Sequence, residues 1–123
     1  ECDDKNIESL QYNLENTNST IIKGYVGFGE GNIDIENIFQ RINKPFIDFI
    51  KIDIEWAEYD LLLNTSDDIM KRINNWVIEV HDIYSHYYKI FQIIEKFSKN
   101  GFDINLEHIH KNTNLALLYV KKR

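Results

Sequence analysis

The chain has 123 residues, and 43% of them are hydrophobic, so it is long enough to form one domain around a single core. A net charge of -6, with no basic cluster before Lys121–Arg123, argues against nucleic acid as the main partner. No apolar run could cross a bilayer and no signal peptide begins the chain, so we expect a cytoplasmic protein without a membrane partner.

The first half of the chain alternates predicted helices with predicted strands. Hydrophobic residues at helical spacing predict a helix over about residues 4–16, and a strand is expected over 20–26. After a glycine-rich turn, residues 35–42 predict a short helix that ends before Pro45. Residues 46–54 are apolar on both alternating faces, which is typical of a central strand in a parallel sheet.

The middle of the chain continues the alternation. Two short helical pieces, 57–63 and 66–73, lead into a strand over residues 76–81. The next predicted helix carries an apolar stripe that begins at Tyr87, and the Asn100-Gly101 pair should stop it.

The last two segments predict a pair of strands. Residues 102–107 alternate between apolar and polar, which is typical of an edge strand, whereas residues 115–120 are nearly all apolar, as in a buried neighbour. Their connection is too short for a crossover helix, so the two strands should be antiparallel. The whole order predicts a single α/β domain over residues 1–123, with an open, mostly parallel sheet whose last strand turns back.

Acidic residues collect where two predicted neighbouring strands end. Asp53 and Glu55 lie at the end of the strand 46–54, and Glu79, His81 and Asp82 lie at the end of the strand 76–81. Ligands of open parallel sheets bind beyond the carboxyl ends of the strands, so these five side chains should face one crevice.

Three further charges near these strand ends have structural interpretations. Glu58 and Asp60 follow on the next helix and are interpreted as solvated surface acids. Lys51 lies within a strand that should be buried, so it needs an ionic partner, and Glu79 on the neighbouring strand is the expected one.

Three kinds of site could use the acids at the strand ends. A divalent metal would accept these carboxylates and His81, but the histidine and cysteine spacings of recognisable metal sites are missing, so no metal is assigned. His108 and His110 are interpreted as turn or solvent-facing residues. Acid/base chemistry is a second possibility, although no nucleophile stands beside a base. A nucleotide-like cofactor, held by an acid at a strand end, fits the topology best.

The stretch IDFIKIDIEWAEYDLL, residues 47–62, closely resembles the signature of the FkbM family of S-adenosylmethionine-dependent methyltransferases, in which DFIKIDIEGAE runs from a strand into a helix. WVIEVHD, residues 76–82, resembles the next strand of that family. ECDDKNIESLQYNLENT, residues 1–17, is similar to its EPxPxNxxxLxxNL stretch, and residues 34–38 are similar to its LDDLL-like segment. The resemblance implies a Rossmann-like class I methyltransferase fold, with strand order 3-2-1-4-5-7-6 and an antiparallel last strand.

The resemblance also implies roles for individual residues. Glu1 would hold the ribose of S-adenosylmethionine, and Asp53 would lie beside both the methyl donor and the acceptor. Glu55, Glu79 and His81 would complete the catalytic group in the same crevice. The implied reaction is methyl transfer to oxygen of a small hydroxylated or sugar-type acceptor, and the sequence carries no signal for the oligomeric state.

Two features depart from the family pattern. Trp56 stands where the family has glycine; a left-handed turn there would cost roughly 1 to 2 kcal/mol, and the indole could fill the acceptor pocket. The first strand and its glycine-rich loop, which cradle the methionine part of the cofactor in the family, would lie before Glu1, so the chain is interpreted as an N-terminally incomplete, C-terminal portion of the enzyme. The alternative is a degenerate, non-catalytic Rossmann-like module for binding or assembly.

A second glycine pattern offers a rival alignment. Residues 26–31 read Val-Gly-Phe-Gly-Glu-Gly between a predicted strand and a predicted helix, and Asp53 follows Gly31 by 22 residues. This spacing is near that of a dinucleotide fingerprint and its ribose acid, so Asp53 would then hold the ribose. The FkbM alignment explains more of the chain.

Overall fold

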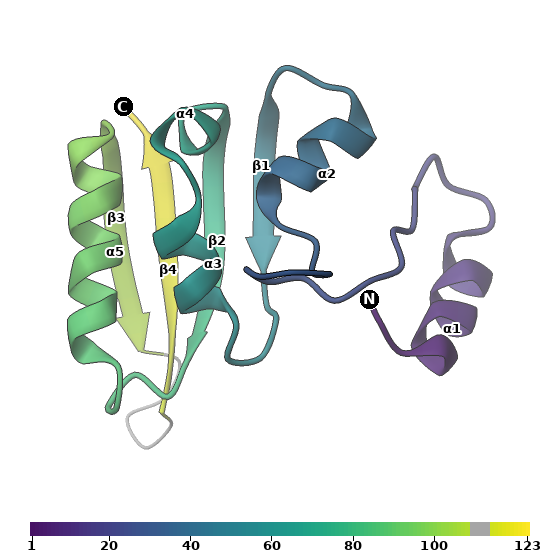
Figure 1. The fold of residues 1–123 in the computed structure, drawn as a ribbon, viewed down its shortest axis with the longest axis horizontal. Coiled ribbons are helices and arrows are strands. Elements are labelled where there is room, and N and C mark those ends of the chain that lie inside the picture. Colours follow the sequence, from purple (N-terminus) through teal and green to yellow (C-terminus); the bar gives the residue numbers. More distant parts are fainter. Residues whose placement is uncertain (109–113) are drawn as a thin grey trace.

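The computed structural model describes residues 1–108 and 114–123 and contains a four-stranded sheet in the order β1-β2-β4-β3 (Figure 1). The strands are β1 (Ile47–Ile52), β2 (Ile73–His81), β3 (Phe102–His108) and β4 (Leu115–Lys122). β1 pairs with β2 in parallel, whereas β4 runs antiparallel to both β2 and β3. The predicted antiparallel pair at the end of the chain is therefore confirmed, with the apolar strand inside and the alternating strand at the edge.

The expectation of a mostly parallel sheet is only partly met. Among the described residues, β1–β2 is the parallel pairing, and the other two pairings are antiparallel. The reason is the position of β4, which lies between β2 and β3 and opposes each of them, although β1, β2 and β3 share one direction. The fold is therefore a mixed α/β arrangement.

Five helices accompany the sheet in the described ranges (Figure 1). The helices α3 (Glu58–Asn64) and α5 (Tyr87–Lys99) cover one face of the sheet, and the short α4 (Asp67–Met70) leads into β2. The helices α2 (Ile35–Ile42) and α1 (Asp4–Leu14) lie on the β1 side, with α1 farthest from the sheet. None of these helices is both long enough and apolar enough to span a membrane.

Local sequence signals explain where the helices begin and end. Asp34 accepts from the backbone N–H of Asn37, whose side chain in turn accepts from the backbone of Asp34, so α2 starts with a capping box. Helix α5 ends before Gly101, which adopts the left-handed conformation that glycine tolerates best, with φ of 85°. The helices predicted over about 4–16, over 35–42 and from Tyr87 are thus confirmed.

The core lies between the sheet and α5. Trp76 of β2 meets Phe97 of α5 edge to face, with ring centroids 5.1 Å apart, and Phe97 meets Phe102 of β3 in the same way at 5.5 Å. All three rings are buried, and burying each large apolar side chain contributes about 1.5–3 kcal/mol. This packing fixes β2, the strand that carries Glu79 and His81.

Two predicted strand features are wrong. Residues 20–26 form no strand: Val26 makes a single bridge to Ile33, and the backbone N–H of Gly24 donates to the carbonyl of Glu1. This segment has no neighbouring strand among the described residues, so its backbone is satisfied by loop contacts. The rival glycine alignment therefore lacks the strand that should precede its loop.

The second error concerns the position of β1. It was predicted to be a central strand, but it lies at the sheet edge among the described residues. Its burial alternates poorly, and Phe49 is 58% exposed. The apolar character of both faces led to the prediction of a covered strand, whereas in the described part of the chain only one edge and part of one face are covered.

Candidate functional site at the ends of β1 and β2

The turn that follows β1 is strained. Glu55 and Trp56 both have positive φ, at 48° and 76°, so two successive residues with side chains adopt the left-handed conformation. The predicted left-handed position of Trp56 is therefore found, at a cost of about 1–2 kcal/mol for a residue that is not glycine. The indole is 62% exposed and its ring lies 6.0 Å from the ring of His81, centroid to centroid. It partly covers the end of β2.

Three of the predicted site residues come together beyond the strand ends. Asp53, Glu79 and His81, called the acid cluster below, each offer one ligand atom, and these atoms lie within 4.8 Å of one another. A carboxylate oxygen of Glu55 lies 3.4 Å from Nε2 of His81, and one of Glu79 lies 3.8 Å from the same nitrogen. The structure thus brings the four catalytic candidates into one neighbourhood.

Glu58 is the site residue that sequence reasoning missed. It was interpreted as a solvated surface acid, but its side chain is completely buried. Its Oε1 accepts from the backbone N–H of His81 at 2.8 Å and lies 2.6 Å from Nδ1 of the same residue. A signal for this position existed, because Glu58 shares a helical face with the buried Leu61 and Leu62 at spacings of three and four. Asp60 is exposed as predicted and pairs with Lys89.

His81 is held tightly by these contacts. Burial opposes its positive charge, but the hydrogen bond and charge of Glu58, followed by the charges of Glu55 and Glu79, raise the pKa of His81 above its ordinary value. The hydroxyl of Tyr59 donates to the carbonyl oxygen of His81 at 2.7 Å. Burial raises the pKa of Tyr59, so this phenol remains a hydrogen-bond donor.

Lys51 does not form the predicted pair with Glu79. Its Nζ donates to Oδ2 of Asp53 at 2.8 Å, two residues further along the chain and just beyond the end of β1. The side chain is 56% exposed, because β1 lies at the sheet edge, so Lys51 is not the buried ammonium that the sequence suggested. Residues two apart on a strand share a face, which explains the observed partner.

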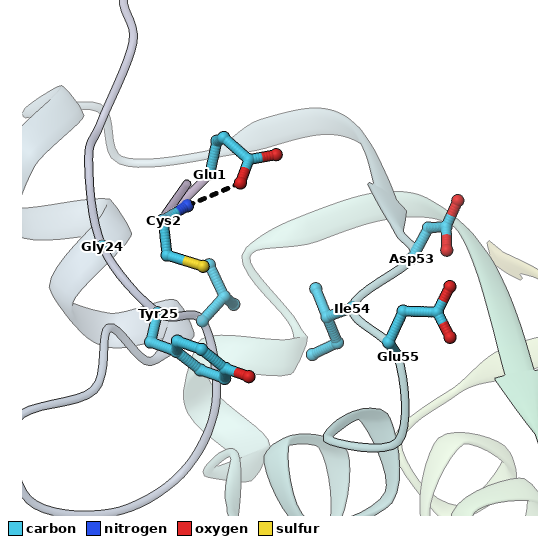
Figure 2. A pocket seen from close by; sticks show the side chains of 8 residues that line it. Glu1, Cys2, Gly24, Tyr25, Asp53, Ile54 and Glu55 are labelled. Carbon is cyan, nitrogen blue, oxygen red and sulfur yellow. Dashed lines mark hydrogen bonds between the residues drawn. The ribbon is translucent and has the colours of Figure 1, made fainter. Parts of the chain in front are cut away.

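A hollow of about 310 Å³ lies on the other side of the turn after β1. One wall is formed by Glu1 and Cys2 with residues 24–26, and the other by residues 53–55. Figure 2 shows the side chain of Ile54 pointing toward the first wall, whereas the carboxylates of Asp53 and Glu55 point away from it. The side chains of this turn therefore point to two sides, with Ile54 toward the hollow and the carboxylates of Asp53 and Glu55 toward the acid cluster.

Glu1 lines the hollow, and its carboxylate folds back on the backbone that follows it. Oε1 accepts from the N–H groups of Cys2 and Asp3 at 2.8 and 2.9 Å. These two bonds, first that from Asp3 and then that from Cys2, lower the pKa of Glu1. The two predicted cofactor residues, Glu1 and Asp53, thus border the same hollow, although the Asp53 carboxylate is turned toward the acid cluster. His110 and the side chain of His108 lie outside the described residues.

A parallel strand pair followed by acids, a hollow beside it and a histidine held by a buried carboxylate form a mixed α/β domain with a candidate ligand site at its strand ends. Residues 5–104 match the Methyltransferase FkbM domain, and the chain belongs to this family of methyltransferases. This confirms the resemblance carried by residues 47–62, whereas Glu1 lies before the matched range. No curated protein and no solved structure matches the chain significantly.

Proposed function

We propose that the protein is an S-adenosylmethionine-dependent O-methyltransferase that acts on a small hydroxylated acceptor of the sugar type. The observation that carries this proposal is that one short segment, residues 53–55, borders the hollow and also supplies Asp53 to the acid cluster. A donor site and an acceptor site must adjoin for methyl transfer, because the reaction depends on alignment of the two reactants. Membership of the FkbM methyltransferase family supports the same reaction class.

The strand order supports a Rossmann-like fold of the class I methyltransferase type. The sheet order β1-β2-β4-β3 corresponds to strands 4-5-7-6 of the seven-stranded order implied by the resemblance. The antiparallel β4 stands between two strands that run the other way, as strand 7 does in that order.

The hollow suits part of the cofactor. Its volume of about 310 Å³ lies at the lower end of the range for small-molecule pockets, roughly 300–1,000 Å³. Glu1, which the family resemblance assigns to the cofactor ribose, would accept hydrogen bonds from the ribose hydroxyls, and Ile54 and Tyr25 would provide apolar contact. When bound, S-adenosylmethionine supplies a methyl group on a cationic sulfonium, and the neighbouring Asp53 and Glu55 favour positive charge.

The acid cluster would receive the acceptor. Asp53 and Glu79 would orient its hydroxyl groups by accepting hydrogen bonds, and His81 would hold this arrangement from β2. Glu55 is the most exposed of the four, at 72% of its side chain, and would take the proton that the acceptor oxygen loses. General base assistance of this kind contributes about 10²–10⁴ in rate.

The test is methyl transfer by the full-length gene product. S-adenosylhomocysteine formation is measured with S-adenosylmethionine and a panel of small sugars and polyols. Glu55→Gln should lower kcat about 100-fold or more, and Asp60→Asn, which removes an exposed acid outside the site, should not. No turnover with any acceptor, or equal turnover by Glu55→Gln, would contradict the proposal.

One observation favours a second candidate, the non-catalytic binding or assembly module. Trp56 occupies the family's glycine position, and its indole ring lies 6.0 Å from the ring of His81, centroid to centroid. In the methyltransferase proposal, Trp56→Gly opens the acceptor side and turnover persists or rises. A module without activity stays inactive after the same substitution.

A further inference from the structure

The acid cluster has the dimensions of a cation site. Its three ligand atoms, one each from Asp53, Glu79 and His81, lie within 4.8 Å of one another. Ligand atoms at about 2.1 Å from one ion lie at most about 4.2 Å apart, so shifts of less than about 1 Å would bring all three onto an ion. Asp53 directly follows β1 and Glu79 lies in the neighbouring β2, so the pairing of these two strands sets their spacing.

His81 provides an independent indication that the cluster is built around a ligand. The residue is only 6% exposed, and its Nδ1 is engaged by the fully buried Glu58. Its other ring nitrogen, Nε2, makes no hydrogen bond among the described residues and faces the carboxylates of Glu55 and Glu79. A buried carboxylate that holds one histidine nitrogen so that the other can bind a metal is a common support of metal ligands.

The local charge also calls for a cation. The carboxylates of Asp53, Glu55, Glu58 and Glu79 gather around His81 and the strand ends. Among the lysines and arginines of the described residues, only Lys51 pairs with one of these carboxylates. It is exposed, and it contacts only Oδ2 of Asp53. Closely spaced carboxylates repel one another, and a bound divalent ion relieves that repulsion.

We propose that Asp53, Glu79 and His81 bind one divalent first-row transition ion, with Glu58 as the positioning residue for the His81 ring. Two carboxylate oxygens and one imidazole nitrogen suit Mn²⁺ or Zn²⁺ better than Mg²⁺ or Ca²⁺, which prefer oxygen alone. Three protein ligands leave coordination positions open for water or for oxygen atoms of a substrate. The proposal concerns cation binding and does not depend on methyl transfer.

The experiment is a titration of the chelator-treated full-length protein with MnCl₂, followed by electron paramagnetic resonance and calorimetry. The wild type should bind one Mn²⁺. Asp53→Asn and Glu79→Gln should each weaken binding more than tenfold, and Glu58→Gln should weaken it about 10–100-fold because the ring is no longer fixed by a carboxylate. Asp60→Asn is the matched control, since it removes one negative charge outside the cluster. Circular dichroism verifies that each variant is folded.

A variant that is expected to strengthen Mn²⁺ binding keeps the test independent of folding defects, because a misfolded protein would bind more weakly. Lys51→Met leaves every ligand in place and removes the cation that competes for Asp53, so it should tighten Mn²⁺ binding roughly two- to fivefold. The proposal is overturned if the wild type has no site tighter than about 1 mM, or if Asp60→Asn weakens binding as much as Asp53→Asn. S-adenosylhomocysteine binding by the same preparation is measured separately, so failure of the metal site is distinguishable from failure of the proposed function.

Discussion

Glu58 and His81 are joined by two contacts from a single carboxylate oxygen. Oε1 of Glu58 accepts from the backbone N–H of His81 at 2.8 Å and lies 2.6 Å from its Nδ1. The first turn of α3 is thereby fastened to the last residue of β2, and the ring of His81 is oriented at the same time. The other oxygen, Oε2, is buried without a hydrogen-bond partner in the described part of the chain. The contact therefore joins α3 to β2 and also orients a side chain of the candidate site.

Removing the Glu58 carboxylate should destabilise the protein strongly. Glu58→Ala leaves the backbone N–H and the ring nitrogen of His81 without their acceptor in a buried place, so we expect a loss of about 2–4 kcal/mol in the free energy of unfolding. Urea denaturation measures it. Glu36→Ala, an exposed change in the first turn of α2, is the comparison and should stay within about 0.5 kcal/mol of the wild type. Equal stability of the two variants would contradict a supporting role for Glu58.

The left-handed conformation of Trp56 predicts an unusual order of stabilities. Trp56→Gly and Trp56→Ala both remove the indole, but only glycine removes the Cβ that strains a residue with φ of 76°. Trp56→Gly should therefore be more stable than Trp56→Ala by about 1 kcal/mol. The reverse order, which is usual where glycine merely loosens the unfolded chain, would show that the turn carries no such strain.

Tyr59 should contribute through its hydroxyl as well as its ring. The hydroxyl donates to the buried carbonyl of His81, and the ring stacks on His86 at 4.8 Å between centroids. Tyr59→Phe keeps the stacking and removes the hydrogen bond, so we expect a loss of about 1–2 kcal/mol in thermal or urea unfolding. Tyr12→Phe, at an exposed position on α1, should have no measurable effect. A neutral Tyr59→Phe would indicate that the carbonyl finds another donor.

Lys96 should anchor the C-terminal end of α3 to α5. Its Nζ donates to the carbonyl oxygens of Leu62 and Leu63 at 3.0 and 2.7 Å, and also to that of Thr65. Burial lowers the pKa of Lys96, as expected for an ammonium group held mainly by carbonyls. Lys96→Met should cost about 1–3 kcal/mol of stability, because three carbonyl groups lose their donor.

The matched control for Lys96 is Lys99, three residues further along α5. Lys99→Met removes an exposed lysine of the same helix that pairs with Glu95, and such surface pairs contribute little, about 0.3–0.5 kcal/mol. Similar losses for the two methionine variants in urea denaturation would mean that the carbonyl contacts of Lys96 do not stabilise α3.

Hydrophobic periodicity predicted the helices and strands whose buried face can be read from their own sequence. The stripe that begins at Tyr87 defines α5, and the apolar run from Trp76 defines most of β2, because in both cases side chains of one face share one environment. The pairing of β3 with β4 was also predictable, since the connection between them leaves room for little else. The family was recognisable for a different reason, the specific residues of 47–62.

The errors arose where partners distant in sequence decide the outcome. Residues 20–26 have the composition of a strand, but a strand requires a neighbour, and the described chain places none beside them. The same cause applies to β1, whose apolar faces predicted burial that the described sheet does not provide. Lys51 was paired with the wrong acid because its exposure depends on that edge position. Glu58 was misjudged because its charge was given more weight than its place on the buried face of α3.

The central claim is that the hollow between Glu1 and residues 53–55 holds the methyl donor beside the acid cluster. Its most direct test is calorimetric titration of S-adenosylhomocysteine into the full-length gene product and its Glu1→Gln variant. The glutamine oxygen can still accept from Cys2 and Asp3, so the loop is preserved and only the charge toward the ribose is lost. We predict binding of one molecule by the wild type and affinity about tenfold lower in the variant. No binding by the wild type, or equal affinity in both proteins, would contradict the claim.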